Sequence, residues 1–347
     1  MAAYTTIDNP GEYFNTKLYT GTGSSHAITG VGFAPNWVWI KKRSATGAHG
    51  LLDTVRGVHK SLATNSSDGT NDDSNSLTAF GSDGFTVGSS GAFNGSSATF
   101  VSWNWKAGTS VSGNTGGSGT AKSYTGSVNT DAGFSIIAYT GNGTAGHTIP
   151  HHLSAVPNIV LTKGRSGALN WFFFDSMSSY LKRLKLNTTD AQADTDGLND
   201  TAPTSSVFTV SGGGEGNTNG TTYVAYLFAE KQGYSKFGSY TGNGNADGTF
   251  IYTGFKPAWL MIKKSSATEE WYMYDNKRTP FNEIAKGLAA NLSGAEFDTG
   301  ATIDFLSNGF KNTGTNTGTN ASGATYIYMA FAENPFVTST GVCATAR

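Results

Sequence analysis

Phe33-Ala-Pro-Asn-Trp-Val-Trp-Ile-Lys41 is the first of three related stretches that decide the fold. The other two are Val156-Pro-Asn-Ile-Val-Leu-Thr-Lys163 and Phe255-Lys-Pro-Ala-Trp-Leu-Met-Ile-Lys263. In each, a proline precedes a short run of large apolar residues that closes at a lysine. This pattern predicts a strand that is covered on both faces, because proline cannot donate to a ladder and therefore tends to begin strands.

Other motifs recur in the same order around each copy. Before it stands a turn, and after it come an aspartate, an asparagine and a closing strand. The turns are Tyr19-Thr-Gly21, Tyr139-Thr-Gly141 and Tyr240-Thr-Gly242; the aspartates are Asp53, Asp175 and Asp275; the asparagines are Asn65, Asn187 and Asn291; the closing strands are Thr99–Trp105, Thr222–Phe228 and Thr325–Phe331. Because the period is that of a domain, we interpret the chain as three tandem modules and not as a solenoid of small units.

The repeats and the segments between them predict six regions. These are a leader at 1–16, repeat 1 at 17–107, a Gly/Ser/Thr-rich linker at 108–122, repeat 2 at 123–232, repeat 3 at 233–334 and a tail at 335–347. Many short strands joined by glycine-rich turns predict an all-β protein of three antiparallel β-sandwich, jelly-roll-like modules. Two segments, 177–186 and 279–291, are expected to be helical, and hairpins are expected at 80–85, 124–139 and 305–310.

Alternate positions of the closing strands differ in character. One face is apolar in every copy, with Trp103, Tyr226 and Met329 at equivalent positions, and this face is expected to lie in the core. The other face varies between copies and includes Ala225 and Tyr328. We expect it to face solvent or a second copy of the chain, which suggests self-association as a homotrimer.

Composition limits the classes of function. Charged residues make up 14% of the chain, against roughly 25% in typical domains, and the net charge is −1, which argues against a nucleic-acid partner. Cys343 is the single cysteine, so neither a disulfide framework nor a cysteine-based metal site is expected. The sequence predicts neither a signal peptide nor a membrane span.

The three repeated aspartates are the most obvious catalytic candidates. A glycosidase needs two carboxylates with unequal pKa values on opposite sides of a sugar ring, whereas each repeat offers one aspartate at a strand end. A residue present in every copy of a tandem module is better explained as part of the fold, and Arg56 and Arg278, three residues after their aspartates, suggest local ion pairs. The sequence therefore predicts no catalytic residue, no organic cofactor and no enzyme activity.

Two acidic loops are candidates for calcium, which prefers oxygen ligands. The candidate ligands are Asp68, Asp72 and Asp73 in repeat 1 and Asp194 and Asp196 in repeat 2. The spacing does not match an EF-hand, and the alternative is a solvated loop rich in turns. The histidines show no metal spacing, since Pro150 separates His147 from His151 and His152 and prevents a two-histidine helical site.

The repeated motifs resemble those of the repeat module in bacteriophage virion and tail-fibre-like proteins, common in marine phages. The resemblance rests on Tyr240-Thr-Gly-Asn-Gly244, Gly254–Lys263, Trp271–Asp275, Asn308-Gly-Phe310 and Thr325–Glu333, and it covers nearly the whole chain. It implies a structural or adhesive virion component, assembled in the host cytoplasm, with other virion proteins as partners and a host-surface glycan or receptor as a further candidate. It names no catalytic residue.

On this basis we expect a tail or fibre component that attaches to the host surface. Within the virion the alternative is a head-decorating protein or capsid fibre. The alternative from another class is a glycan depolymerase, which would require a carboxylate pair confined to one repeat and set in a cleft.

Overall fold

The computed structural model describes residues 4–343, which are almost entirely antiparallel β-structure. Repeat 1 forms a sheet in the order β1-β9-β3-β4, a smaller sheet β2-β8-β7 and the pair β5-β6. Its elements are a 3₁₀ turn at Pro10–Glu12, β1 (Phe14–Thr20), β2 (His26–Thr29), β3 (Trp37–Lys42), β4 (Gly50–Asp53), β5 (Lys60–Ser61), β6 (Asn71–Asp72), β7 (Leu77–Gly81), β8 (Gly84–Val87), α1 (Gly91–Asn94) and β9 (Thr99–Trp105).

Repeat 2 has the larger sheet β10-β12-β13-β20-β15-β16-β17-β18 and the smaller sheet β11-β14-β19. Its elements are β10 (Thr109–Asn114), β11 (Gly116–Gly117), β12 (Ser123–Asn129), β13 (Phe134–Thr140), β14 (His147–Pro150), β15 (Ile159–Gly164), β16 (Trp171–Asp175), a 3₁₀ turn at Ser176–Ser178, β17 (Lys182–Lys185), β18 (Ala193–Asp194), β19 (Val207–Val210) and β20 (Thr222–Phe228).

Repeat 3 is one continuous sheet in the order β21-β28-β23-β24-β25-β26-β27-β22. Its elements are β21 (Ser235–Thr241), β22 (Phe250–Tyr252), β23 (Phe255–Lys264), β24 (Trp271–Asp275), β25 (Ile284–Ala289), β26 (Phe297–Leu306), β27 (Gly309–Asn312), α2 (Thr317–Asn320) and β28 (Thr325–Pro335).

The same four-stranded unit occurs in every repeat. It is β1-β9-β3-β4 in the first, β13-β20-β15-β16 in the second and β21-β28-β23-β24 in the third. In repeat 1, Trp37 lies between Trp105 and Asp53 in the register. Ile159 and Trp259 occupy the same place in the other repeats. The prediction that each proline-initiated run forms a buried strand is thus confirmed, and the structure adds that this strand pairs with the closing strand of its repeat.

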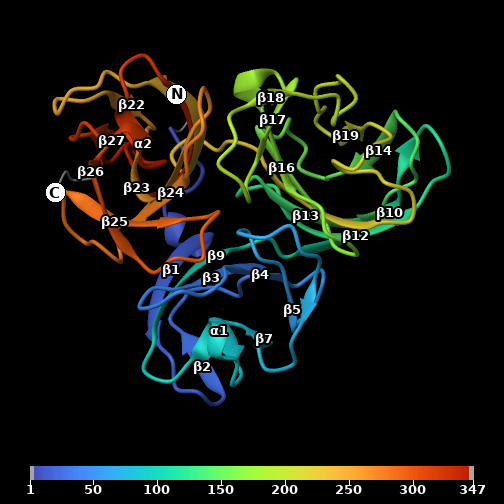
Figure 1. The fold of residues 1–347 in the computed structure, drawn as a ribbon, viewed down its shortest axis with the longest axis horizontal. Coiled ribbons are helices and arrows are strands. Elements are labelled where there is room, and N and C mark those ends of the chain that lie inside the picture. Colours follow the sequence, from blue (N-terminus) through green and yellow to red (C-terminus); the bar gives the residue numbers. More distant parts are fainter. Residues whose placement is uncertain (1–3, 344–347) are drawn as a thin grey trace.

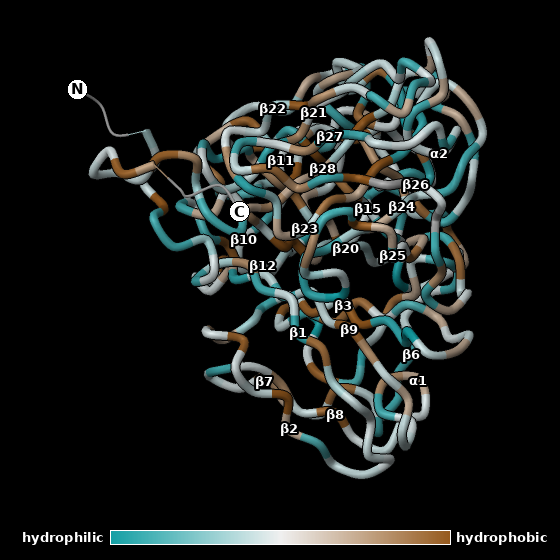
Figure 2. The backbone as a smooth tube through the Cα atoms, turned by 90° about the vertical axis from the view of Figure 1, so that its left-hand side faces the viewer, coloured by the Kyte–Doolittle hydropathy of each residue, from teal (hydrophilic) through white to brown (hydrophobic). Residues whose placement is uncertain are grey.

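The three repeats surround one shared hydrophobic core, which we call the central cluster. Figure 1 shows three lobes around a common centre. In Figure 2 hydrophobic stretches run along β3, β9 and β23 near that centre. The central cluster joins the uniformly apolar faces of the three closing strands to their neighbours. Its largest members are Trp37, Trp39, Trp103, Trp105, Trp171, Trp259 and Trp271.

The burial of the uniformly apolar face is confirmed, since Trp103, Tyr226 and Met329 all belong to the central cluster. The expectation for the other face is wrong. Ala225, Leu227, Tyr328 and Ala330 are buried in second clusters that lie within repeats 2 and 3. In each repeat additional strands cover the outer face of the four-stranded unit, so these residues cannot serve as a surface for another copy.

Each Tyr-Thr-Gly turn is held in the same way. The tyrosine hydroxyl donates to a carbonyl oxygen before the closing strand, as Tyr240 does to Thr319 at 2.6 Å. The residue after the turn's glycine donates its backbone N–H to a buried asparagine, as Asn243 does to Asn320 in repeat 3. A side chain in place of Gly242 would collide with the carbonyl oxygen of Ala321, which explains the repeated glycine.

Several local predictions are corrected. The segments 177–186 and 279–291 contain β17 and β25 instead of helices. Part of the predicted linker forms β10, an exposed edge strand that pairs with β12, because backbone pairing orders it without apolar burial. The hairpins β7-β8, β12-β13 and β26-β27 are confirmed. No helix in the described part of the chain is long and apolar enough to cross a membrane.

Candidate functional site

The repeated aspartates lie fully buried at the ends of β4, β16 and β24. Asp53 Oδ2 accepts from Arg56 Nε at 2.5 Å, and Asp275 Oδ2 accepts from Arg278 Nε at 2.6 Å, so the two predicted ion pairs are confirmed. Each arginine also donates to the carbonyl oxygen two residues before its aspartate. These carboxylates and guanidinium groups therefore pair inside the fold and do not face an open cleft.

Asp53 and Asp275 each accept a further hydrogen bond from a neighbouring repeat. Tyr226 of repeat 2 donates its hydroxyl to Asp53 Oδ2 at 2.7 Å, and the indole N–H of Trp103 in repeat 1 donates to Asp275 Oδ2 at 3.0 Å. Tyr226, Trp103 and Met329 are equivalent positions of the closing strands. The central cluster thus supplies polar contacts between repeats as well as apolar packing, which the sequence motifs did not indicate.

Asp175 is the exception among the three. Repeat 2 has Ser178 where the other repeats have arginine, and the closing-strand position of repeat 3 is Met329, whose thioether cannot donate. Ser178 N–H donates to Asp175 Oδ1 at 2.9 Å, but within residues 4–343 no donor contacts Oδ2. Burial raises the pKa of Asp175 to about 6.

The lysines that end the three runs form a second cyclic set of contacts between repeats. Lys41 Nζ donates to Ser293 and Gly294 of repeat 3 at 3.1 and 2.7 Å. In the same manner Lys163 Nζ donates to Ser67 of repeat 1 at 2.7 Å, and Lys263 Nζ to Thr189 of repeat 2 at 3.2 Å. Every acceptor is a backbone carbonyl oxygen in the loop after the repeated asparagine. Burial lowers the pKa of each of these lysines to about 8.

A third set of contacts between repeats involves the ring side chain that stands four positions before each aspartate. The indole N–H of Trp171 donates to Ala63 O at 2.8 Å, and that of Trp271 to Lys185 O at 3.1 Å. Repeat 1 has His49 there, and its Nε2 lies 2.9 Å from Ala289 O. Burial lowers the pKa of His49 to about 3, so the ring stays neutral.

The repeated asparagines fix these rings, because each side-chain oxygen accepts from the backbone N–H of the ring-bearing residue. Asn65 accepts from His49, Asn187 from Trp171 and Asn291 from Trp271, at distances of 2.9, 2.9 and 3.0 Å. The most repeated polar residues of the chain thus hold the three repeats together.

The structure gives the candidate calcium ligands of the acidic loops separate surroundings. Asp72 pairs with Lys60, and Asp194 lies 3.8 Å from Lys182 Nζ. Asp68 accepts from the Ser66 hydroxyl at 2.7 Å, Asp73 accepts from the backbone of Asn75 at 2.9 Å, and Asp196 is exposed. No group of three carboxylate, histidine or cysteine side chains that could hold a metal ion occurs in the part of the chain that the structure describes.

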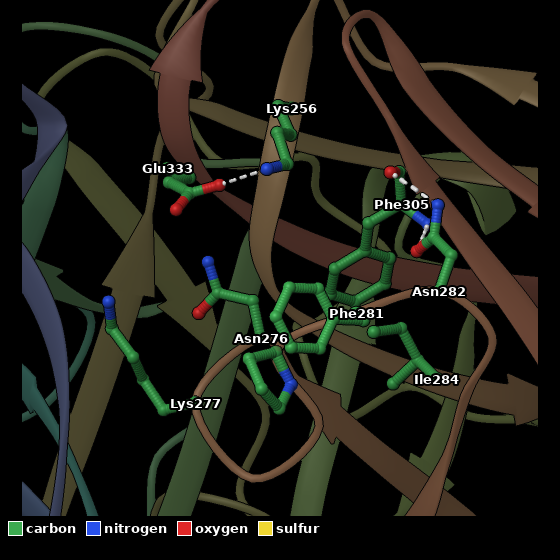
Figure 3. Close-up of a pocket in the computed structure, with 9 residues that line it drawn as sticks. Lys256, Asn276, Lys277, Phe281, Asn282, Ile284, Phe305 and Glu333 are labelled. Carbon is green, nitrogen blue, oxygen red and sulfur yellow. Dashed lines mark hydrogen bonds and ion pairs between the residues drawn. The ribbon is translucent and has the colours of Figure 1, made fainter. Parts of the chain in front are cut away.

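A surface groove in repeat 3 has a volume of about 540 Å³, and no repeated motif indicated it. It lies beside the loop 276–283, which leads from β24 to β25 (Figure 3). Phe281 projects from this loop with 79% of its surface exposed. Across the groove Lys256 pairs with Glu333 at 2.7 Å, as Figure 3 shows.

The comparisons with known proteins connect the chain to one family. No curated protein and no solved structure matches it. A family model described as a domain of unknown function (DUF7483) matches residues 9–335. The matched span contains all three repeats and, apart from Ile7, the central cluster they share. The chain therefore belongs to the DUF7483 family.

Proposed function

We propose that the chain is a structural protein of a bacteriophage virion, a tail or fibre component that presents three β-sandwich, jelly-roll-like modules for attachment to the host surface. The resemblance of the repeated motifs to phage virion modules supports this proposal. So does the way in which the repeats are interlocked. Two cyclic sets of hydrogen bonds, a third set that lacks its contact at Asp175 and one central cluster use the repeated polar and aromatic residues for cohesion.

A cohesive body of this kind suits a particle component that has to resist shear and drying. Each repeat contributes to a core that the other two complete, so local opening of one module exposes surface of all three. This interlocking is the observation that carries the proposal, because it explains why polar residues recur in every copy without forming an active site.

The proposal includes binding without catalysis. Glycan hydrolysis requires two carboxylates on opposite sides of a sugar, and the repeated aspartates are instead buried at strand ends, two of them in ion pairs with arginine. The assay is release of sugars from host envelope material by the purified chain. Sugar release that is abolished by Asp53→Asn, Asp175→Asn or Asp275→Asn in a folded protein would favour the depolymerase reading.

The virion role is tested by mass spectrometry of density-purified phage particles from the phage that encodes this chain. We expect the chain at a constant copy number per particle, and cryo-electron microscopy of the same particles distinguishes a tail or fibre position from a head-decorating one. Absence of the chain from particles that retain infectivity would overturn the proposal.

Self-association as a homotrimer remains a prediction for this virion component. The closing-strand residues that suggested it are internal, so any contact between copies has to use other surfaces. Light scattering at micromolar concentration decides the question, since a trimer and a monomer differ threefold in mass.

A further inference from the structure

The groove beside the loop 276–283 is part of a longer channel on the surface. Two further hollows, of about 150 and 340 Å³, continue it across the junction between repeat 3 and β1. Lys277 lines all three hollows and marks the middle of the channel. From Phe281 at one end to Lys17 at the other, amides, hydroxyls and ammonium groups alternate with apolar side chains. The polar side chains include Asn9, Asn15, Thr16, Asn276, Asn282 and Lys256.

The loop that carries Lys277 and Phe281 is fixed at both ends. At its start Asp275 Oδ1 accepts from the backbone N–H groups of Lys277 and Arg278, at 3.0 and 2.8 Å. At its end the Asn282 side chain exchanges two hydrogen bonds with the backbone of Phe305. The exposed lysine and phenylalanine are thus held on a positioned segment, which lowers the entropic cost of binding a ligand.

These two side chains are confined to repeat 3. At the position of Lys277 the first and second repeats have Val55 and Met177, and at the position of Phe281 they have His59 and Leu181. A residue that recurs in all three copies is explained by the fold they share. The combination of a cation and an exposed aromatic ring in one copy alone has no such explanation and indicates a separate role.

Two buried polar atoms in the channel lack partners. Asn276 is 9% exposed and Thr16 is 5% exposed, and both line the middle hollow. Within residues 4–343 neither Asn276 Oδ1 nor Thr16 Oγ1 has a hydrogen-bond partner. Buried polar atoms nearly always have one, so the middle hollow is bordered by two polar groups whose hydrogen-bonding capacity the fold does not use.

The charge of the channel is positive. Lys256 and Glu333 neutralise each other, while the ammonium group of Lys277 forms no ion pair with any described residue. Lys17 adds a second cation at the far end. An anionic group would therefore gain a charge-assisted hydrogen bond at the middle of the channel.

We propose that this channel binds an acidic oligosaccharide, with Lys277 on a carboxylate or sulfate group and the Phe281 ring against the apolar face of a sugar. Sugar hydroxyls both donate and accept, which matches the amides of Asn9, Asn15 and Asn276 and the hydroxyl of Thr16. Apolar residues line the channel as well, with Phe281, Phe305 and Ile284 at one end and Phe14, Ala258 and Ala332 in the middle hollow. It is therefore the unpaired ammonium group beside an exposed ring that favours an acidic sugar over a peptide. This inference rests on the proposed attachment function, since it names the ligand class of that attachment.

The test is isothermal titration of the full chain with carboxylated and sulfated hexasaccharides, a galacturonate hexamer among them, and with a neutral glucose hexamer as the control ligand. The variants are Lys277→Gln and Phe281→Ser, both at exposed positions where folding is not at risk. The matched control variants are Lys182→Gln and Leu181→Ser, which change an exposed lysine and the residue equivalent to Phe281 in repeat 2.

We expect binding of at least one acidic hexamer, weakened at least about tenfold by Lys277→Gln and about fivefold by Phe281→Ser. Added sodium chloride should weaken it further, and the control variants should bind like the wild type. Equal binding of the neutral hexamer, wild-type affinity in both variants or no binding across the panel would each overturn the inference. The two tests are separate. A failure to bind acidic hexamers overturns this inference and leaves the virion proposal standing, whereas absence of the chain from phage particles overturns the virion proposal whatever the titration shows.

Discussion

At the scale of single residues, three equivalent aspartates differ because their neighbours differ. Asp53 and Asp275 each accept from an arginine and from a ring donor in another repeat. Asp175 has neither, and its Oδ2 is buried without a donor. A buried carboxylate is tolerated when it is paired and destabilising when it is not. Removing the charge should therefore have opposite effects on stability at equivalent positions of the three repeats.

The first prediction concerns these aspartates. Asp53→Asn should cost about 3–5 kcal/mol of unfolding free energy, because it leaves the Arg56 guanidinium buried without a counter-charge. Asp175→Asn should instead stabilise the protein at pH 7–8. Its pKa is raised from 3.8 to about 6, so the wild type loses stability as the pH rises through this interval, by up to about 3 kcal/mol.

Urea denaturation at pH 4 and pH 8 measures the effect. The stability difference between Asp175→Asn and wild type should largely vanish at pH 4, which is close to the unfolded pKa of 3.8 and well below the folded pKa of about 6. A variant that is less stable than wild type at pH 8 would contradict the assignment of an unpaired carboxylate.

The second prediction separates packing from hydrogen bonding at Trp103. Trp103→Ala should cost about 3–5 kcal/mol, because it empties a fully buried site in the central cluster. Trp103→Phe keeps most of the ring but removes the donor to Asp275, and we expect about 1–3 kcal/mol. Thermal melts of both variants give the comparison, and a Trp103→Phe variant as stable as wild type would mean that the indole N–H contributes nothing.

At the scale of elements, each proline-initiated strand ends in a lysine that reaches another repeat. The run predicts a buried strand, and a lysine at its end has usually been read as the point where the chain returns to solvent. Here the ammonium groups of Lys41, Lys163 and Lys263 donate to carbonyl oxygens of the adjoining repeat instead. The lysine at each strand end therefore hydrogen-bonds one repeat to the next.

The third prediction follows from these strand ends. Lys163→Met should cost about 1–3 kcal/mol, because it leaves the carbonyl oxygens of Ser67 and Leu169 without their buried donor. The control is Lys182→Met, an exposed lysine in the same repeat that should change stability by no more than about 0.5 kcal/mol. Chemical denaturation compares the two, and similar small effects would show that the strand-end lysine is dispensable.

At the scale of the whole molecule, the central cluster makes the three repeats depend on one another. A repeat separated from the others would expose the apolar face of its closing strand and the rings that pack on it. In repeat 3 these include Trp259, Trp271 and Phe331. Exposed apolar patches of this kind promote aggregation or association.

The fourth prediction is that the chain unfolds in one cooperative transition and that an isolated repeat 3 does not fold by itself. The calorimetric enthalpy of the full chain should equal the van't Hoff enthalpy. Residues 233–343 expressed alone should lack a near-ultraviolet circular dichroism signal and should bind a hydrophobic dye. A cooperative melt of this fragment would show that each repeat is an autonomous domain.

The sequence alone was sufficient for the strands and for the threefold repetition. A proline before a bulky run and a period-two closing strand are local patterns, and the structure has strands at all six places. The predicted ion pairs of Asp53 and Asp275 were also accessible, because their arginines lie three residues away. The helices expected at 177–186 and 279–291 failed, since pairing with a neighbouring strand overrides a weak local preference.

Only the tertiary structure decided which face of each sheet meets which partner. Alternation reveals that a strand has two faces, but both faces of the closing strands are buried, one inside its own repeat and one in the central cluster. The contacts that fasten Trp171 to Ala63 and Tyr226 to Asp53 join residues more than a hundred positions apart. The two hollows that extend the groove from Lys277 toward Lys17 likewise form only where β1 meets repeat 3, because residues of both segments line them.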